Sequence, residues 1–301
     1  MRAKPILIGA GVVAAVLVGI GLYAASRIDT ADVIRLVAEK VKTQTGRELK
    51  VDGKVGFSVS LEPTVSLEGV RFQNAPWGSR PDMAIVKRVD VGIALIPLLS
   101  GKVNIRGLTL IEPDVLLETN AKGTGNWEFD TPKSNDTPSD GGSKSLPIDI
   151  HHAEIEKGVV TYRSAKDKSE KKLELASLLG RISGGQTTFT GTGSLNAESI
   201  EIAAKVDRNA SPAAVDVTLK SPGASLTAKA SPTSGASSTE ATSAQFNLVV
   251  SDWNRLAKLV GTAPITLPAL KAEGKFETTA RTTRIEGLKA TLGKSTFNGR
   301  V

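Results

Sequence analysis

The stretch Val103–Leu110, VNIRGLTL, changes the phase of its β-strand pattern at a glycine. Its apolar residues take odd positions before Gly107, as alternate residues on one face of a strand do, and even positions after it. A β-bulge, one extra residue in a strand, produces such a change and increases the local twist. A glycine turn between two short strands gives the same pattern. If Gly107 marks a bulge or tight corner, we expect Ile105 and Leu108 on the same concave face.

The same change of phase occurs in two other stretches of the chain. It crosses Gly69 in VSLEGVRF (65–72) and Gly287 in RIEGLKA (284–290). The spacings between the three glycines are unequal, which argues against a strict short repeat. We therefore predict that Gly69, Gly107 and Gly287 bend one long sheet.

The remaining pattern predicts a mainly β chain with helices as exceptions. Residues 29–45 have apolar side chains at helical spacing and are followed by Gly46, so they predict one amphipathic helix. Beyond it, apolar residues alternate with polar ones, which predicts antiparallel strands, and a short helix is expected at 254–259. The alternation is clearest at Val55, Phe57, Val59 and Leu61, and at Val89, Val91, Ile93 and Leu95.

The N-terminal segment predicts a transmembrane anchor over residues 1–27. Residues 5–26 carry no charge and are long enough, as a helix, to cross the roughly 30 Å of bilayer hydrocarbon. Two basic residues precede them, which places the N-terminus in the cytoplasm and the bulk of the chain outside. The alternative is a signal peptide cleaved near Ala24 or Ser26, although its apolar region should be shorter.

Composition predicts two regions in the exported part, joined by a linker, and excludes chemistry that needs cysteine. Residues 131–147 lack apolar side chains over most of their length, so we expect a flexible linker between a module at 28–130 and a β-rich region at 148–301. The strand pattern is still in progress at Val301, so that region is expected to be incomplete. There are no cysteines, which excludes disulfides, thiolate nucleophiles and iron–sulfur clusters.

The net charge of +7 gives no sign of nucleic-acid binding, because the basic residues are dispersed and only 4% of residues are aromatic. Attraction to an anionic membrane surface explains this charge better than nucleic-acid binding does. GKST (293–296) lacks the first glycine of a phosphate-binding loop. The adjacent His151 and His152 point to opposite faces of a strand, so they cannot share a metal. We expect no enzyme activity, no metal and no cofactor.

Several motifs resemble the N-terminal region of the AsmA family of bacterial envelope proteins. They follow the predicted membrane helix in order: TGRELKVDGKV (45–55), VSLEGVRFQNAPWGS (65–79), IPLLSGKVNIRGLTLIEPDVLLE (96–118) and GTGNWEF (123–129). The later IEGLKATLGKSTFNGRV (285–301) is similar to family repeats but less diagnostic.

The resemblance implies an inner-membrane anchor and a long β-rich body in the periplasm. Members of the family are similar to the chorein-type bridge-like lipid-transfer proteins, and the resemblance implies a sheet that curls into an open apolar groove for phospholipid acyl chains. The resemblance also implies a role in outer-membrane biogenesis. Alternation alone does not separate an open groove from a closed sandwich core.

Two functions remain open at this point. The first is a lipid-binding or lipid-conducting groove that has phospholipid and the membrane as its partners. The second is a structural or regulatory envelope protein that binds other proteins through exposed sheet edges. For the first, the expected lining residues are Val55, Phe57, Val59, Leu61, Val91, Ile93, Leu95, Ile105 and Leu108.

Overall fold

The computed structural model describes residues 30–58, 63–94, 105–129, 151–210, 214–232, 242–278 and 283–299. The predicted anchor (1–27), the linker (131–147) and the predicted groove residues Val59, Leu61 and Leu95 lie outside these ranges. A search of the described helices for one long and apolar enough to cross a bilayer finds none.

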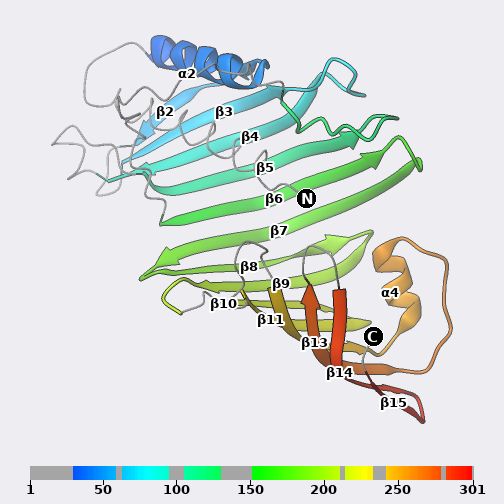
Figure 1. Cartoon of the computed structure of the whole chain (residues 1–301). Coiled ribbons are helices and arrows are strands. Elements are labelled where there is room, and N and C mark those ends of the chain that lie inside the picture. Colours follow the sequence, from blue (N-terminus) through cyan, green and yellow to red (C-terminus); the bar gives the residue numbers. More distant parts are fainter. Residues whose placement is uncertain are drawn as a thin grey trace, which may run out of the picture. The chain divides into compact units, whose positions relative to one another are not determined.

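The chain is mainly β, as the sequence predicts, and its strands form one long, mixed, mostly antiparallel sheet (Figure 1). It divides into two compact units, Met1–Lys172 and Leu173–Val301. The division falls inside one strand, and each unit is described below by itself.

The first unit pairs its strands in the order β1-β3-β4-β5-β6, and the short β2 also pairs with β3. Its elements are α2 (Thr30–Thr45), β1 (Leu49–Val51), β2 (Val55–Ser58), β3 (Thr64–Gln73), β4 (Asp82–Ile93), β5 (Ile105–Thr119) and β6 (His152–Ser164).

Helix α2 matches the predicted amphipathic helix and packs against the sheet. Gly46 ends it with φ of 71°, a conformation that glycine adopts without strain, and its N–H donates to the Lys42 carbonyl at 2.8 Å. Val41 is 2% exposed and belongs to the buried apolar cluster of this unit. The other buried members come from β3, β4 and β5: Val65, Leu67, Val89, Val91, Ile93 and Ile105.

The pairing of β5 with β6 is an exception to the antiparallel pairing that the sequence predicts. These two strands run parallel, with Gly107 opposite His152 and Thr119 opposite Ser164. Residues 120–151 connect them, and a connection of that length can return the chain to the starting end of β5, which a hairpin loop cannot do.

Strand β5 runs through Gly107 without interruption, so the change of phase there does not mark a turn between two short strands. Ile93 pairs with Ile105 while Gly92 pairs with Gly107, so Arg106 is an extra residue on β5. Gly107 therefore lies beside a bulge and not in a hairpin turn. Ile105 and Leu108 both contact the same apolar cluster.

A second change of phase runs across four neighbouring strands. By the register of the neighbouring pairs, Gly69 on β3 faces Lys87 on β4, and Lys87 faces Glu112 on β5. Glu112 in turn faces Lys157 on β6. At each of these positions the regular backbone pairing of the two strands is interrupted. We call these four residues the phase-change row. Three of them have left-handed φ values: Gly69 at 65°, Glu112 at 49° and Lys157 at 52°.

On β3 and β4 the apolar residues on both sides of this row lie on the same face of the sheet. Leu67 and Val70, which lie on either side of Gly69, both pack against the apolar cluster, as do Val86 and Val89 on β4. A residue in the left-handed region turns the strand so that the alternation restarts on the same face. The row itself carries charge, and the Lys87 ammonium lies 2.7 Å from a Glu112 carboxylate oxygen.

The second unit is a run of antiparallel strands in chain order with one helix. It begins within β7 (Ser169–Ser183) and continues with β8 (Gln186–Leu195), β9 (Glu198–Asp207), β10 (Ala214–Ser221), β11 (Ala224–Pro232), β12 (Thr242–Val250), α4 (Trp253–Val260), β13 (Leu270–Thr278), β14 (Thr283–Leu292) and β15 (Ser295–Gly299).

Gly287 also lies at an irregularity of the sheet, between β13 and β14. The register shifts so that Gly274 faces two residues of β14, and Gly287 has φ of 59°. Gly293 and Lys294 of the GKST stretch form the turn from β14 to β15, Ser295 and Thr296 begin β15, and no helix follows in the described residues.

Candidate functional site: the apolar face of the second unit

One face of the second unit is apolar along every strand from β7 to β14. Antiparallel partners that stand directly opposite share a face, so the register of each strand pair identifies the rows. One row runs Gly180–Phe189–Ala204–Val217–Ala228–Phe246–Gly274. The next runs Leu178–Gly191–Ile202–Leu219–Leu226–Leu248–Ala272–Ala290–Phe297. A third runs Ile182–Thr187–Val206–Val215–Ala230–Ala244–Phe276–Ile285.

The opposite face of the same strands is polar. A row between the apolar ones runs Thr190–Ala203–Thr218–Thr227–Asn247–Glu273–Lys289–Asn298. This part of the sheet is therefore strongly amphipathic, and removing its apolar face from water would be favourable.

The described residues do not bury that face. In the second unit only Leu175, Val250 and Ala257 are buried apolar residues among those described. Phe189 is 40% exposed, Leu219 39% and Phe297 55%. Among the described residues, all the exposed large apolar side chains but Trp77 lie in this unit. We call the three rows the apolar face.

The predicted groove residues occupy a different place, in the first unit. Val91, Ile93 and Ile105 are fully buried in the cluster to which Val41 of α2 belongs, and Val55 and Leu108 pack against it. The backbone of Phe57 pairs with Val65. The structure thus brings five of the predicted residues together, in a closed cluster that includes a residue of α2.

The sequence alone does not predict the apolar face, because small residues between its large ones weaken the pattern of alternating apolar and polar residues. Phe189 and Phe246 are joined across the sheet by Ala204, Val217 and Ala228, and alanine carries little weight in an alternation pattern. Its length depends on the register of many strand pairs, which a single strand does not reveal.

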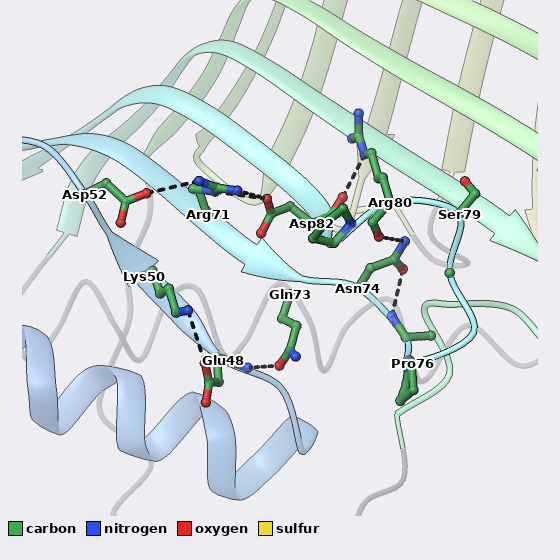
Figure 2. A pocket seen from close by; sticks show the side chains of 13 residues that line it. Glu48, Lys50, Asp52, Arg71, Gln73, Asn74, Pro76, Ser79, Arg80 and Asp82 are labelled. Carbon is green, nitrogen blue, oxygen red and sulfur yellow. Dashed lines mark hydrogen bonds and ion pairs between the residues drawn. The ribbon is translucent and has the colours of Figure 1, made fainter.

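A polar pocket of about 620 Å³ in the first unit is the second candidate site (Figure 2). Arg71 lies between two carboxylates there: its guanidinium donates to Asp82 through Nε at 2.9 Å and through Nη2, and its Nη1 lies 3.4 Å from Asp52. Lys50 lies 3.4 Å from Glu48, which also accepts from Lys42 at 3.0 Å.

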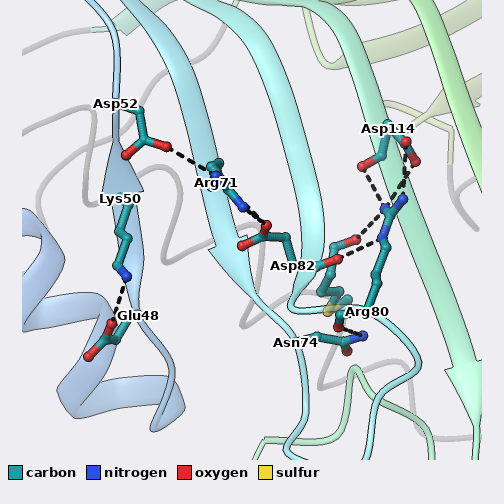
Figure 3. A network of polar contacts seen from close by, with 9 residues as sticks. Glu48, Lys50, Asp52, Arg71, Asn74, Arg80, Asp82 and Asp114 are labelled. Carbon is teal, nitrogen blue, oxygen red and sulfur yellow. Dashed lines mark hydrogen bonds and ion pairs between the residues drawn. The ribbon is translucent and has the colours of Figure 1, made fainter.

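The third cation of the pocket, Arg80, is paired as well (Figure 3). Its two terminal nitrogens reach the Asp114 carboxylate at 3.1 and 3.0 Å, and its Nε donates to the Asp82 carbonyl at 2.7 Å. Because each cation of the pocket already faces a carboxylate, the pocket offers little net charge to a ligand. Its contacts instead fix the loop at 74–81.

A buried network holds the other end of this loop. Asn126, which is fully buried, donates to the side-chain carbonyl of Asn74 at 2.9 Å and to the Leu116 carbonyl at 2.8 Å. Asn74 donates to a Glu118 carboxylate oxygen at 2.8 Å, and the Ser79 backbone N–H donates to the same oxygen at 2.8 Å.

The carboxylate of Glu118 is the one charged group at the centre of this network, and it is 6% exposed. Burial acts to raise its pKa, but the hydrogen bonds from Ser79 and Asn74 and the charge of Arg163 favour the ionised form and hold the pKa below its ordinary value. The buried polar groups of this network therefore satisfy one another by hydrogen bonds, and the network has a structural role.

The described residues offer no metal site, because no three of their His, Asp or Glu side chains are grouped to hold an ion. His151 precedes β6 and His152 begins it, and the imidazole of His152 lies over Gly107, where a methyl group on the glycine would collide with it.

Comparison with known proteins assigns the chain to a family. No curated protein matches it. The AsmA family matches it over residues 6–299, a span that covers nearly all of both units described above. The family is not known for enzymes. The chain belongs to the AsmA family.

Proposed function

We propose that this protein binds phospholipid acyl chains on the apolar face of the second unit and conducts them along it. The observation that carries the proposal is an amphipathic sheet whose apolar side chains, Leu219 and Phe189 among them, remain about 40% exposed. Acyl chains are the natural cover for such a face, because they bury apolar area while the headgroup stays in water.

The dimensions and energies of the apolar face suit a lipid. Strands lie about 4.8 Å apart, so the rows from β8 to β14 extend for roughly 30 Å, about the hydrocarbon thickness of a bilayer. Each buried methylene contributes about 0.8 kcal/mol, so about a dozen contribute on the order of 10 kcal/mol. A similar gain in the bilayer makes exchange between membrane and protein close to balanced.

The setting of this activity is part of the proposal. An uncharged segment at residues 5–26, preceded by two basic residues, supports an inner-membrane anchor with the sheet in the periplasm. Membership of the AsmA family supports a role in maintaining the outer membrane.

Photocrosslinking in intact cells tests the lipid contact. The full chain carries p-benzoylphenylalanine in place of Phe246 on the apolar face, or in place of Asn247, its neighbour on the polar face. We expect phospholipid adducts, identified by mass spectrometry, at position 246 and not at 247. Absence of lipid adducts at position 246, or equal amounts at both positions, overturns the proposal.

A second candidate function is strand addition at β15. All five residues of Ser295–Gly299 are exposed, and among the described strands β15 pairs only with β14. An open edge of this kind can accept a strand from another protein. A protein adduct from a photocrosslinker at Asn298, with no lipid adduct at Phe246, favours this function.

A further inference from the structure

The segment that follows α4 displays apolar side chains to solvent. Val260 is 43% exposed, Ile265 42% and Leu267 46%. All residues from 260 to 269 are exposed. Three exposed large aliphatic side chains within eight residues of sequence suit contact with an apolar partner.

Hydrogen bonds hold this segment at both ends. At its start, Gly261 has φ of 77° and Thr262 donates to the Ala257 carbonyl at 2.8 Å. At its end, the Trp253 indole donates to the Pro268 carbonyl at 2.7 Å, and the Gly293 N–H donates to the Ala269 carbonyl at 3.0 Å. The apolar side chains therefore project from an anchored backbone, which lowers the entropic cost of binding.

The segment is continuous with the apolar face. It leads directly into Leu270, which stands opposite Val250 on one side and Leu292 on the other. At the C-terminal end of α4, where the segment begins, the Asn196 side chain from the turn between β8 and β9 donates to the Leu259 carbonyl at 2.9 Å. α4 and its loop thus stand where the strands of the apolar face turn (Figure 1).

The charges around the segment favour an anionic lipid surface over a basic protein partner. Lys271 follows it, and Lys294 lies beside Gly293, whose N–H bonds to the loop. Residues 261–270 contain no acidic side chain. Lysines that flank exposed aliphatic residues are typical of segments that lie in the interface of an anionic membrane.

We propose that residues 260–267 form a membrane-docking loop, which inserts Val260, Ile265 and Leu267 into the interface of an anionic phospholipid membrane. The inference rests on the proposed function, because docking places the end of the apolar face against lipid. An acyl chain then passes between membrane and protein without crossing water.

The absence of cysteine from the sequence allows a direct test. Leu267→Cys, labelled with the environment-sensitive dye NBD, is prepared in the full chain in phosphatidylcholine nanodiscs. On addition of vesicles of phosphatidylethanolamine and phosphatidylglycerol, we expect a blue-shifted and stronger emission. The same dye at Thr227→Cys, an exposed position on the polar face, should not respond. No response at 267, or an equal response at both positions, overturns the proposal.

Two substitutions in the loop separate insertion from charge. Ile265→Asp removes an aliphatic side chain and adds a charge, whereas Thr266→Asp adds the same charge at the next residue. In vesicle flotation we expect Ile265→Asp to weaken binding by about tenfold or more and Thr266→Asp by about twofold or less. Equal losses would reduce the effect to electrostatics and contradict insertion.

The outcomes at the loop and on the apolar face are independent. If NBD at 267 stays silent while lipid adducts persist at Phe246, the docking loop is refuted and the proposed lipid binding stands. If NBD responds while adducts at 246 are absent, membrane docking stands and the proposed function fails.

Discussion

The side-chain amide of Asn126 donates a hydrogen bond of 2.9 Å to the side-chain carbonyl of Asn74, and so joins two segments that lie 52 residues apart. Each asparagine belongs to a motif that resembles the family, Asn-Ala-Pro-Trp and Asn-Trp. The contact gives both motifs a structural role, because together with Glu118 they hold the loop 74–81 in place by hydrogen bonds.

Asn126→Ala should therefore destabilise the first unit. The substitution removes two donated hydrogen bonds and leaves the Glu118 backbone N–H, which donates to Asn126 at 3.0 Å, without its partner in a fully buried place. We expect a loss of about 2–4 kcal/mol in the free energy of unfolding, measured by urea denaturation of the full chain. Asn247→Ala, on the exposed polar face, should change it by less than about 0.5 kcal/mol. Similar losses for the two variants would contradict this role.

The left-handed conformation of Gly69 leads to a second prediction. An alanine there has to adopt φ near 65°, and its methyl group would lie 3.2 Å from the Gly53 nitrogen. Gly69→Ala should cost about 1–2 kcal/mol in thermal or urea unfolding, and Gly69→Asn less, because asparagine tolerates this region. Gly56→Ala is the control, since its methyl group meets only the Ser66 Cβ at 3.7 Å. An equal cost at positions 56 and 69 would refute the conformational explanation.

Lys157 provides the reverse experiment in the same phase-change row. Its φ of 52° is unfavourable for lysine, so glycine relieves strain while it adds freedom to the unfolded chain. We expect Lys157→Gly to leave the free energy of unfolding within about 0.5 kcal/mol of the original. Glu156→Gly, at an exposed neighbour whose φ is negative, should lose about 1 kcal/mol. A larger loss at 157 than at 156 would show that the left-handed residue is not strained.

The phase-change row also shows how far the sequence predicts this fold. Gly69 and Gly107 reveal breaks in alternation because glycine is the residue expected at bulges and turns, and α2 and most strands follow from their periodicity. Glu112 and Lys157 adopt the same conformation without any compositional sign. Only the alignment of strands across the sheet identifies them as members of one row.

Non-local pairing limits the prediction of the site in the same way. The parallel contact of β5 with β6 follows a long connection whose return path has no local signal. The clearest alternation, at Val89–Ile93, belongs to strands buried beneath a helix, whereas the exposed apolar face uses alanine, glycine and threonine between its large residues. Strong periodicity thus identifies the best-packed strands, not the ones that remain open.

The buried carboxylate of Glu118 should make stability depend on pH. Its pKa is lower in the folded protein than its ordinary value of 4.5, so its contribution is fully present above pH 4.5 and is lost as the pH falls through the folded-state pKa. Glu118→Gln should be less stable at neutral pH by about 1–3 kcal/mol, since the neutral amide loses the negative charge that the hydrogen bonds from Ser79 and Asn74 and the charge of Arg163 stabilise.

The difference between Glu118→Gln and the unsubstituted protein should narrow as the pH falls below 4.5, in urea denaturation followed from pH 7 to 3. Glu156→Gln, at an exposed position, should keep the pH profile of the unsubstituted protein. A difference that stays constant over this range would mean that ionisation of Glu118 does not stabilise the fold.

Charge substitutions on the two apolar surfaces should have opposite effects. Val91 is fully buried, so Val91→Asp places an unpaired carboxylate in a closed core and should unfold the first unit, with a loss of about 4 kcal/mol or more. Leu219 is 39% exposed, so Leu219→Asp keeps its charge in contact with water and should cost less than about 1.5 kcal/mol. Urea denaturation measures both, and Thr218→Asp on the polar face is the matched control for Leu219.

The same Leu219→Asp variant should lose bound phospholipid, because a carboxylate at the centre of the apolar face has to be desolvated by any acyl chain that crosses it. We expect a reduction of about tenfold in the lipid that co-purifies with the full chain, measured by mass spectrometry, whereas Thr218→Asp retains its lipid. If Leu219→Asp unfolds the second unit instead, the face is a closed core in solution. If the folded variant keeps its lipid, the phospholipid is bound elsewhere.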